Sequence, residues 1–167
     1  EEASIFSEKE KYVEAMNYFE SARKMAEETQ NFREMGIVLT NIGLVHYNQG
    51  NYEESLRYLD KVMSLNYESM GGDFVWETLL YKGDSNVKQN KFEEAKRDYE
   101  ESIRIIENIR SQINLEDLKA KFLGTEKRIE PYHNLINLLV TLYNSEARKE
   151  YIPDVFKYLE KAKARAF

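Results

Sequence analysis

The chain has 167 residues and a net charge of −6 at pH 7, with 42% hydrophobic and 32% charged residues. This balance is typical of a folded, water-soluble domain, and the acidic charge disfavours nucleic acid or an anionic membrane surface as the main partner. Without cysteine, which fits a cytoplasmic protein, the chain has no disulfide, thiolate metal site or cysteine nucleophile. Only seven glycines and two prolines interrupt it, which favours helices over a turn-rich sheet fold.

Three segments share one hydrophobic pattern, at 11–25, 51–65 and 91–105. Each opens on an aromatic residue, continues with a small residue three positions later, and adds large and small residues at further steps of four and three. Such steps place side chains on one face of a helix. Three copies at a constant spacing of 40 residues predict an array of repeated helices.

A partner helix is expected before each of the later two segments, over 32–50 and 73–90. Gly43 and Gly83 stand at matching places in these partners, 40 residues apart. A glycine inside a helix costs about 1 kcal/mol relative to alanine, so its recurrence predicts a close helix–helix contact. Asn31 and Asn51, each followed three residues later by glutamate, predict capped helix starts.

The last unit departs from the 40-residue period. Pro131 is expected to open one helix and Pro153 to lie in the first turn of the next. The additional residues fall within 106–130, where the preceding helix is expected to continue through Ile106, Ile109 and Ile113. A further apolar stripe and a loop are expected at Leu115, Leu118, Phe122, Gly124 and Thr125.

The segment 41–65, NIGLVHYNQGNYEESLRYLDKVMSL, resembles the tetratricopeptide repeat, or TPR. The residues that carry the resemblance are Gly43, Tyr47, Gly50, Tyr52, Ser55, Leu59 and Val62. The resemblance implies an all-α fold, a superhelix of about three full antiparallel helix pairs plus a truncated first repeat, of which only residues 1–9 of the first helix remain. We expect a single TPR domain over 1–167, divided into a partial repeat at 1–30, a repeat at 31–70, a repeat at 73–122 with an extended second helix, and an atypical terminal pair at 131–167.

Residues 103–167 carry a narrower resemblance, to the TPR region that precedes CHAT domains, which are caspase-like cysteine peptidase modules often found in bacteria. Its residues are Tyr132, Leu135, Ile136, Leu138 and Leu139, and the closing EKAKARAF at 160–167. The chain begins without methionine and stops inside an expected helix, so we expect a piece of a longer protein. The catalytic His and Cys of the CHAT family have no counterpart in it.

The TPR resemblance implies a concave groove that binds a peptide or partner domain. The residues expected to face that groove are Thr40, Asn41, Leu44, Tyr47 and Asn48, and, in the next repeat, Leu80, Tyr81, Asp84 and Lys88. Asn41 matches an asparagine with which chaperone-binding TPRs hold a peptide C-terminus. Ile37, Glu77 and Tyr81 stand where such a clamp needs basic residues, so a chaperone-tail adaptor is disfavoured. Packing of Tyr47 and Leu80 on adjacent repeats is the alternative interpretation.

Residues with catalytic chemistry are few. His46 and His133 lack a second ligand at metal-binding spacing, no phosphate-binding loop is present, and no pair of acids indicates acid–base catalysis. The sequence predicts a non-enzyme without catalytic residues, metal or cofactor. Two functions remain: a regulatory module of a CHAT-type protein, or a free-standing TPR adaptor or peptide sensor. Self-association is expected through apolar residues at both ends, which include Phe6, Phe156 and Leu159.

Overall fold

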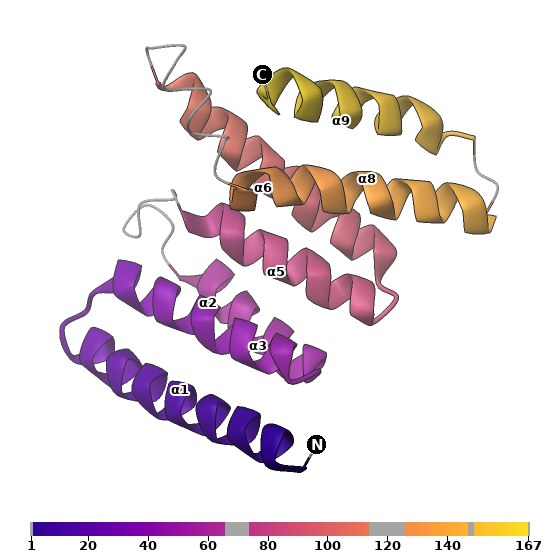
Figure 1. The fold of residues 1–167 in the computed structure, drawn as a ribbon. Helices are drawn as coiled ribbons and strands as arrows, with labels where there is room; N and C mark the ends of the chain where they lie inside the picture. The colour runs from indigo at the N-terminus through magenta and orange to yellow at the C-terminus, as the bar shows by residue number, and fades with distance from the viewer. Residues whose placement is uncertain (1, 66–73, 114–125, 147–148, 167) are drawn as a thin grey trace. The chain divides into compact units, whose positions relative to one another are not determined.

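The computed structural model describes residues 2–65, 74–113, 126–146 and 149–166. Throughout these ranges the regular structure is helical, so the predicted all-α fold is confirmed. The chain divides into two compact units, Glu1–Phe74 and Val75–Phe167. The first unit holds α1 (Glu2–Glu28), α2 (Phe32–Asn48) and α3 (Tyr52–Ser64), and the second holds α5 (Val75–Lys88), α6 (Phe92–Ser111), α8 (Glu126–Glu146) and α9 (Tyr151–Ala166) (Figure 1).

Within each unit, consecutive helices run back and forth beside one another (Figure 1). In the first unit α2 packs against both α1 and α3, and in the second α6 packs against both α5 and α8, while α9 packs on α8. Helices such as α3 and α6 bury one stripe each, as repeated amphipathic helices do. Fully buried side chains include Ile42, Leu59 and Val62 in the first unit and Tyr99 and Leu139 in the second.

The predicted close contacts at the two helix glycines are confirmed. A Cβ atom on Gly43 would lie 2.8 Å from the Leu59 side chain, and one on Gly83 would lie 2.4 Å from the ring of Tyr99. Both glycines therefore let the second helix of a pair approach the first more closely than any side chain would allow.

The turns of the two central pairs also match. Gly50 has φ +77°, and Asn90, 40 residues later, has φ +58°. Asparagine is one of the few other residues that adopt this left-handed conformation readily, so Asn90 replaces the usual glycine without changing the turn. At Asn31 the predicted cap is confirmed, because its side chain accepts a hydrogen bond from the Glu34 amide at 3.1 Å.

Several expectations about helix boundaries are wrong. Asn51 makes no side-chain cap hydrogen bond, and the first turn of α3 instead carries Glu53 and Glu54, whose carboxylates favour a helix N-terminus. No break separates 1–9 from 11–25, because α1 contains no glycine or proline and continues as one helix. Pro131 lies inside α8, since Glu126, Lys127 and Arg128 favour helix and extend its start.

The helix α6 ends at Ser111, so Ile106 and Ile109 extend it as expected and Ile113 lies beyond it. Pro153 falls in the first turn of α9, as predicted. The expected stripe and loop at Leu115, Leu118, Phe122, Gly124 and Thr125 lie outside the described residues.

Candidate functional site

The best candidate surface of the first unit is one edge of α2. Asn41, Leu44 and Tyr47 are partly exposed and Asn48 is exposed, and their spacing places them on the same side of the helix. The Asn41 side chain makes no hydrogen bond within the described part of the chain, and its amide is not among the buried polar atoms that lack a partner. The ring of Tyr47 lies 5.5 Å from that of Tyr52, which supports its position at this edge.

Thr40 was expected at the same edge but is only 5% exposed. Its hydroxyl donates a hydrogen bond to the Gly36 carbonyl oxygen at 2.9 Å, one turn earlier in the helix. Thr40 is therefore a packing residue, because its polar atom is satisfied inside its own helix.

The helix α5 presents much less surface than the sequence indicates. Leu80 is fully buried and Tyr81 is 9% exposed, so the expectation that they face outward is wrong. The reason is that α5 is buried around most of its circumference, like a central helix, rather than along one stripe. Of the four α5 residues predicted to line a groove, Asp84 is partly exposed and Lys88 is exposed.

Asp84 joins three helices of the second unit. Its Oδ1 accepts one hydrogen bond from the Tyr99 hydroxyl at 2.7 Å and another from the Asn134 amide at 2.8 Å. Burial raises the pKa of the Asp84 carboxyl, and the two hydrogen bonds oppose that rise. One oxygen of this predicted groove residue is therefore already used to hold α6 and α8 against α5.

A second polar cluster joins α5 to the start of α8. The Tyr81 hydroxyl donates to Glu77 Oε1 at 3.2 Å, and the Lys127 ammonium also bonds that oxygen. Lys127 lies 5.7 Å from the centre of the Tyr81 ring. Burial raises the pKa of Tyr81, and the contact with Lys127 opposes the rise. Lys127 thus places a positive charge beside Glu77 and Tyr81, where the sequence predicts none. Glu77 forms an ion pair with it.

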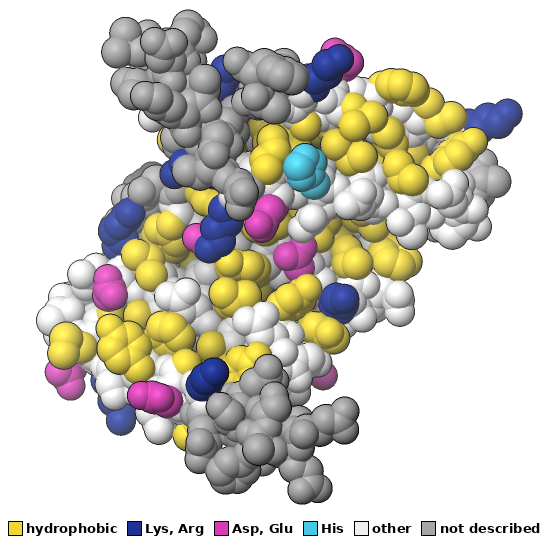
Figure 2. All heavy atoms as spheres, in the orientation of Figure 1, with side chains coloured by type: hydrophobic (Ala, Val, Ile, Leu, Met, Phe, Trp, Pro, Cys, Tyr) yellow, Lys and Arg dark blue, Asp and Glu magenta, His cyan; other side chains and the backbone are white. Residues whose placement is uncertain are grey.

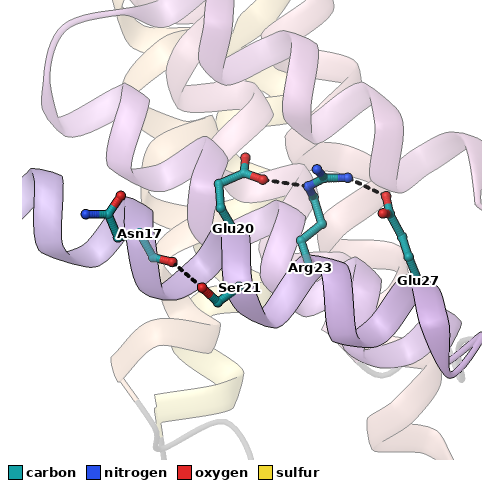
Figure 3. Close-up of polar contacts among 5 residues, drawn as sticks. All are labelled: Asn17, Glu20, Ser21, Arg23 and Glu27. Carbon is teal, nitrogen blue, oxygen red and sulfur yellow. Dashed lines mark hydrogen bonds and ion pairs between the residues drawn. The ribbon is translucent and has the colours of Figure 1, made fainter.

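A hollow of about 430 Å³ lies among the three helices of the first unit. The Arg23 Nε donates to Glu20 at 2.8 Å and its Nη1 bonds Glu27, so the guanidinium sits between two carboxylates of its own helix (Figure 3). The hydrogen bond with Glu20 raises the pKa of Arg23, although burial opposes it. The hollow combines these charges with an apolar wall; its lining is Glu20, Arg23, Glu27, Met35, Leu39, Tyr58, Lys61, Ser64 and Leu65.

The sequence gives no sign of this hollow. Its lining comes from three helices, and no local pattern indicates which side chains of separate helices meet. Tyr58 forms part of the wall, and its ring stacks on His46 with 5.3 Å between the ring centres, while the Lys61 ammonium lies 4.7 Å from the centre of the Tyr58 ring. The charges of the lining balance, so the hollow suits an uncharged, apolar group better than an ion.

The described residues contain no group of three His, Asp or Glu side chains that could hold a metal ion. His46 stacks on Tyr58, and His133 is exposed on α8. No helix within the described ranges combines the length and apolarity needed to cross a bilayer.

The two central pairs, α2–α3 and α5–α6, thus repeat the same glycine contact and the same turn. Residues 34–108 match the tetratricopeptide repeat family. The match spans nearly all of these two pairs, and the chain has an all-α, TPR-type helical repeat fold. TPRs are non-catalytic modules that generally mediate interactions between proteins. No curated protein matches the chain.

Proposed function

We propose that this chain is a protein-interaction module that binds a peptide or partner domain along the exposed edge of α2. The observation that supports this most is the partly exposed Asn41 amide, which has no hydrogen bond within the described part of the chain. An asparagine side chain offers both donors and an acceptor. It can therefore pair with the backbone of an extended peptide, which presents the same two groups.

The neighbours of Asn41 favour an internal peptide segment over a free C-terminus. Leu44 and Tyr47 offer apolar contacts beside the amide, and Ile37 stands where a carboxylate clamp would need a basic residue. A terminal carboxylate would lose its hydration without gaining a cation, which is unfavourable. We include Asn48 in this α2 site because it is exposed. In the second unit, taken by itself, we propose Asp84 and Lys88 of α5 as contact residues, because Asp84 is partly exposed and Lys88 is exposed.

The test begins with selection of peptides that bind the full chain from a display library of internal segments. Asn41→Ala and Tyr47→Ala should each weaken binding of a selected peptide by at least about tenfold, which is 1.4 kcal/mol. Their thermal melting curves should stay close to that of the wild type. Asn17→Ala is the matched control, because Asn17 is an exposed asparagine on α1.

Equal affinity of the wild type and Asn41→Ala would overturn the proposed site. A large loss of helical stability in either α2 variant would show instead that the residue belongs to the packing. Loss of binding in Asn17→Ala would indicate a site on α1.

We also propose that the module regulates a CHAT-type protein of the cytoplasm, and this rests only on the resemblance of residues 103–167. The flanking sequence of the gene tests it. A caspase-like His and Cys downstream support the proposal, whereas a stop codon soon after Phe167 supports a free-standing adaptor or peptide sensor.

A further inference from the structure

The hollow of the first unit has an apolar floor and a polar rim. Its volume of about 430 Å³ falls within the roughly 300–1,000 Å³ that is typical of small-molecule sites. Leu39 is 5% exposed and forms the floor together with the partly exposed Met35 and Leu65. Glu27 and Lys61 of the lining are exposed and mark the rim. A ligand can therefore bury an apolar part on the floor and keep a polar part in contact with water.

The hollow is separate from the peptide site proposed at the edge of α2. Helical spacing places Met35 and Leu39 on the opposite side of α2 from Asn41 and Leu44. A ligand in the hollow would therefore not touch the residues of that edge. An inference about the hollow goes beyond the proposed function and can be tested independently of it.

The α1 wall of the hollow disfavours an anion. Glu20, Arg23 and Glu27 lie in one row along this helix (Figure 3). Arg23 bonds both carboxylates, through Nε to Glu20 at 2.8 Å and through Nη1 to Glu27. Because two carboxylates share one cation, this wall carries one negative charge in excess. A negatively charged group in the hollow would therefore turn away from α1.

The α3 wall offers a cation instead. The Lys61 ammonium lies 4.7 Å from the centre of the Tyr58 ring and forms no ion pair within the described part of the chain. Arg57 lies 5.5 Å from the centre of the same ring, but it pairs with Glu54 at 2.6 Å. Of these two cations beside Tyr58, Lys61 is thus the one left to pair with a ligand.

We propose that the hollow binds a small organic acid, in which an apolar chain or ring carries a single carboxylate. The apolar part lies on Met35, Leu39 and Leu65, where its burial is favourable. The carboxylate lies at the rim beside Lys61, where it gains a cation and keeps part of its hydration. The excess negative charge of the α1 wall favours this orientation over the reverse one.

Titration of the full chain with 8-anilinonaphthalene-1-sulfonate tests the proposal, because this probe joins an apolar body to one negative charge and fluoresces when it is buried. It should show a saturable site. Lys61→Glu turns an attraction into a repulsion and should weaken binding at least about fivefold. Lys11→Glu is the matched control, since Lys11 is an exposed lysine of α1 outside the lining, and it should bind like the wild type.

A neutral probe separates the charge contact from the apolar one. N-phenyl-1-naphthylamine has the same apolar body without the sulfonate, so it should bind the wild type and Lys61→Glu equally. Met35→Glu places a charge on the floor and should weaken both probes at least about tenfold. Met25→Glu is its control, because Met25 is 67% exposed and lies outside the lining. Circular dichroism checks the fold, and if Met35→Glu unfolds, the two probes on Lys61→Glu still decide.

Two further variants exclude other binding places. Hydrophobic side chains also gather at the surface over α8 and α9 (Figure 2), and Phe156 of α9 is 64% exposed. Phe156→Asp should leave both probes unaffected, and a loss confined to this variant would place them on α9 and overturn the proposal. Asn41→Ala should also leave both probes unaffected, so that failure of the peptide site and failure of this site can be told apart.

Competition tests the class of ligand. Octanoate should displace 8-anilinonaphthalene-1-sulfonate from the wild type, and octanamide, which lacks the charge, should do so less well. Displacement by a peptide with an apolar residue beside Asp or Glu, but not by octanoate, would overturn the assignment to a small acid. Equal affinity of the charged probe for the wild type and Lys61→Glu would overturn the site itself.

Discussion

The pairs α2–α3 and α5–α6 have the same backbone design and different interiors. In α2–α3 the helix glycine, Gly43, receives the side chain of Leu59, and in α5–α6 the equivalent Gly83 receives the ring of Tyr99. The contact of Leu59 with Gly43 is purely apolar. Tyrosine fills the same place and also donates a hydrogen bond to Asp84, 2.7 Å away.

At a second set of equivalent positions, a ring contact in the first unit is likewise replaced by a hydrogen bond in the second. His46 and Tyr58 stack at 5.3 Å in the first unit. The residues 40 positions later, Asn86 and Asp98, form a hydrogen bond of 2.8 Å instead. The repeat thus determines which positions meet, and the residue type determines whether they meet through stacking or through a hydrogen bond.

The difference makes the second pair more dependent on particular partners. An apolar contact is non-directional and tolerates small shifts, whereas a buried hydrogen bond fails when one partner is removed. Variants at equivalent positions should therefore behave differently in the two pairs. Trp76, the only tryptophan, lies in α5, so its fluorescence follows the second unit, while circular dichroism follows all helices.

Leu59→Ala should cause the largest loss. Leu59 is fully buried, and such a truncation costs about 2–5 kcal/mol through the cavity it leaves. Tyr99→Phe keeps the ring and removes only the hydroxyl, so we expect a loss of about 1 kcal/mol. Urea unfolding measures both. Equal losses would mean that the Tyr99 hydrogen bond matters as much as the Leu59 packing, contrary to the comparison.

Asp84→Ala should cost about 1–3 kcal/mol, because Tyr99 and Asn134 lose their shared acceptor. Asp84→Asn keeps an acceptor and removes the charge, so it should be milder. Leu44→Ala, at the equivalent position of α2, removes only a partly exposed side chain and should cost less than Asp84→Ala.

The difference in stability between the wild type and Asp84→Asn should depend on pH, because burial raises the pKa of Asp84. The folded protein binds the proton more tightly than the unfolded chain, whose Asp pKa is near 3.8. The wild type should therefore lose stability relative to Asp84→Asn as the pH rises from that value through the folded pKa. Urea titrations from pH 3.5 to 8 measure the difference, and parallel curves would contradict the assignment.

Gly83→Ala should be more harmful than Gly43→Ala. An added Cβ would lie within 3 Å of three atoms of the Tyr99 ring, which is rigid and held by Asp84. Overpacking costs about 1–3 kcal/mol, and alanine returns about 1 kcal/mol through helix propensity. A Cβ on Gly43 would come no closer than 2.8 Å to Leu59, a milder overlap than 2.4 Å at the Tyr99 ring, so Gly43→Ala should cost less. The ranking fails if Gly43→Ala unfolds at the lower urea concentration.

Glu20→Gln and Glu101→Gln should have the smallest effects, about 0.5 kcal/mol or less for each ion pair. Both glutamates pair with an arginine three residues later, at 2.8 Å for Glu20 and 2.7 Å for Glu101. The hydrogen bond from Arg104 lowers the pKa of Glu101 below its ordinary 4.5. Its contribution is present above that value and is lost as the pH falls through the lowered pKa, opposite in sign to Asp84.

The repeat, its spacing and the role of Gly43 and Gly83 can all be predicted from the sequence. These features are local or periodic: a stripe of side chains follows from helical geometry, and a costly glycine that recurs in register needs a close neighbour. The left-handed turn at Gly50 is also a local feature that the sequence predicts, because glycine adopts that backbone conformation without strain.

Burial around α5, the hollow of the first unit and the two hydrogen bonds to Asp84 depend on tertiary structure. The TPR resemblance predicts that Leu80 and Tyr81 face outward, and only the packing of neighbouring helices shows that both are buried. Asp84 and Asn134 are 50 residues apart. Helical periodicity sets the direction of each side chain from its own axis, but it carries no information on which side chain of another helix lies opposite.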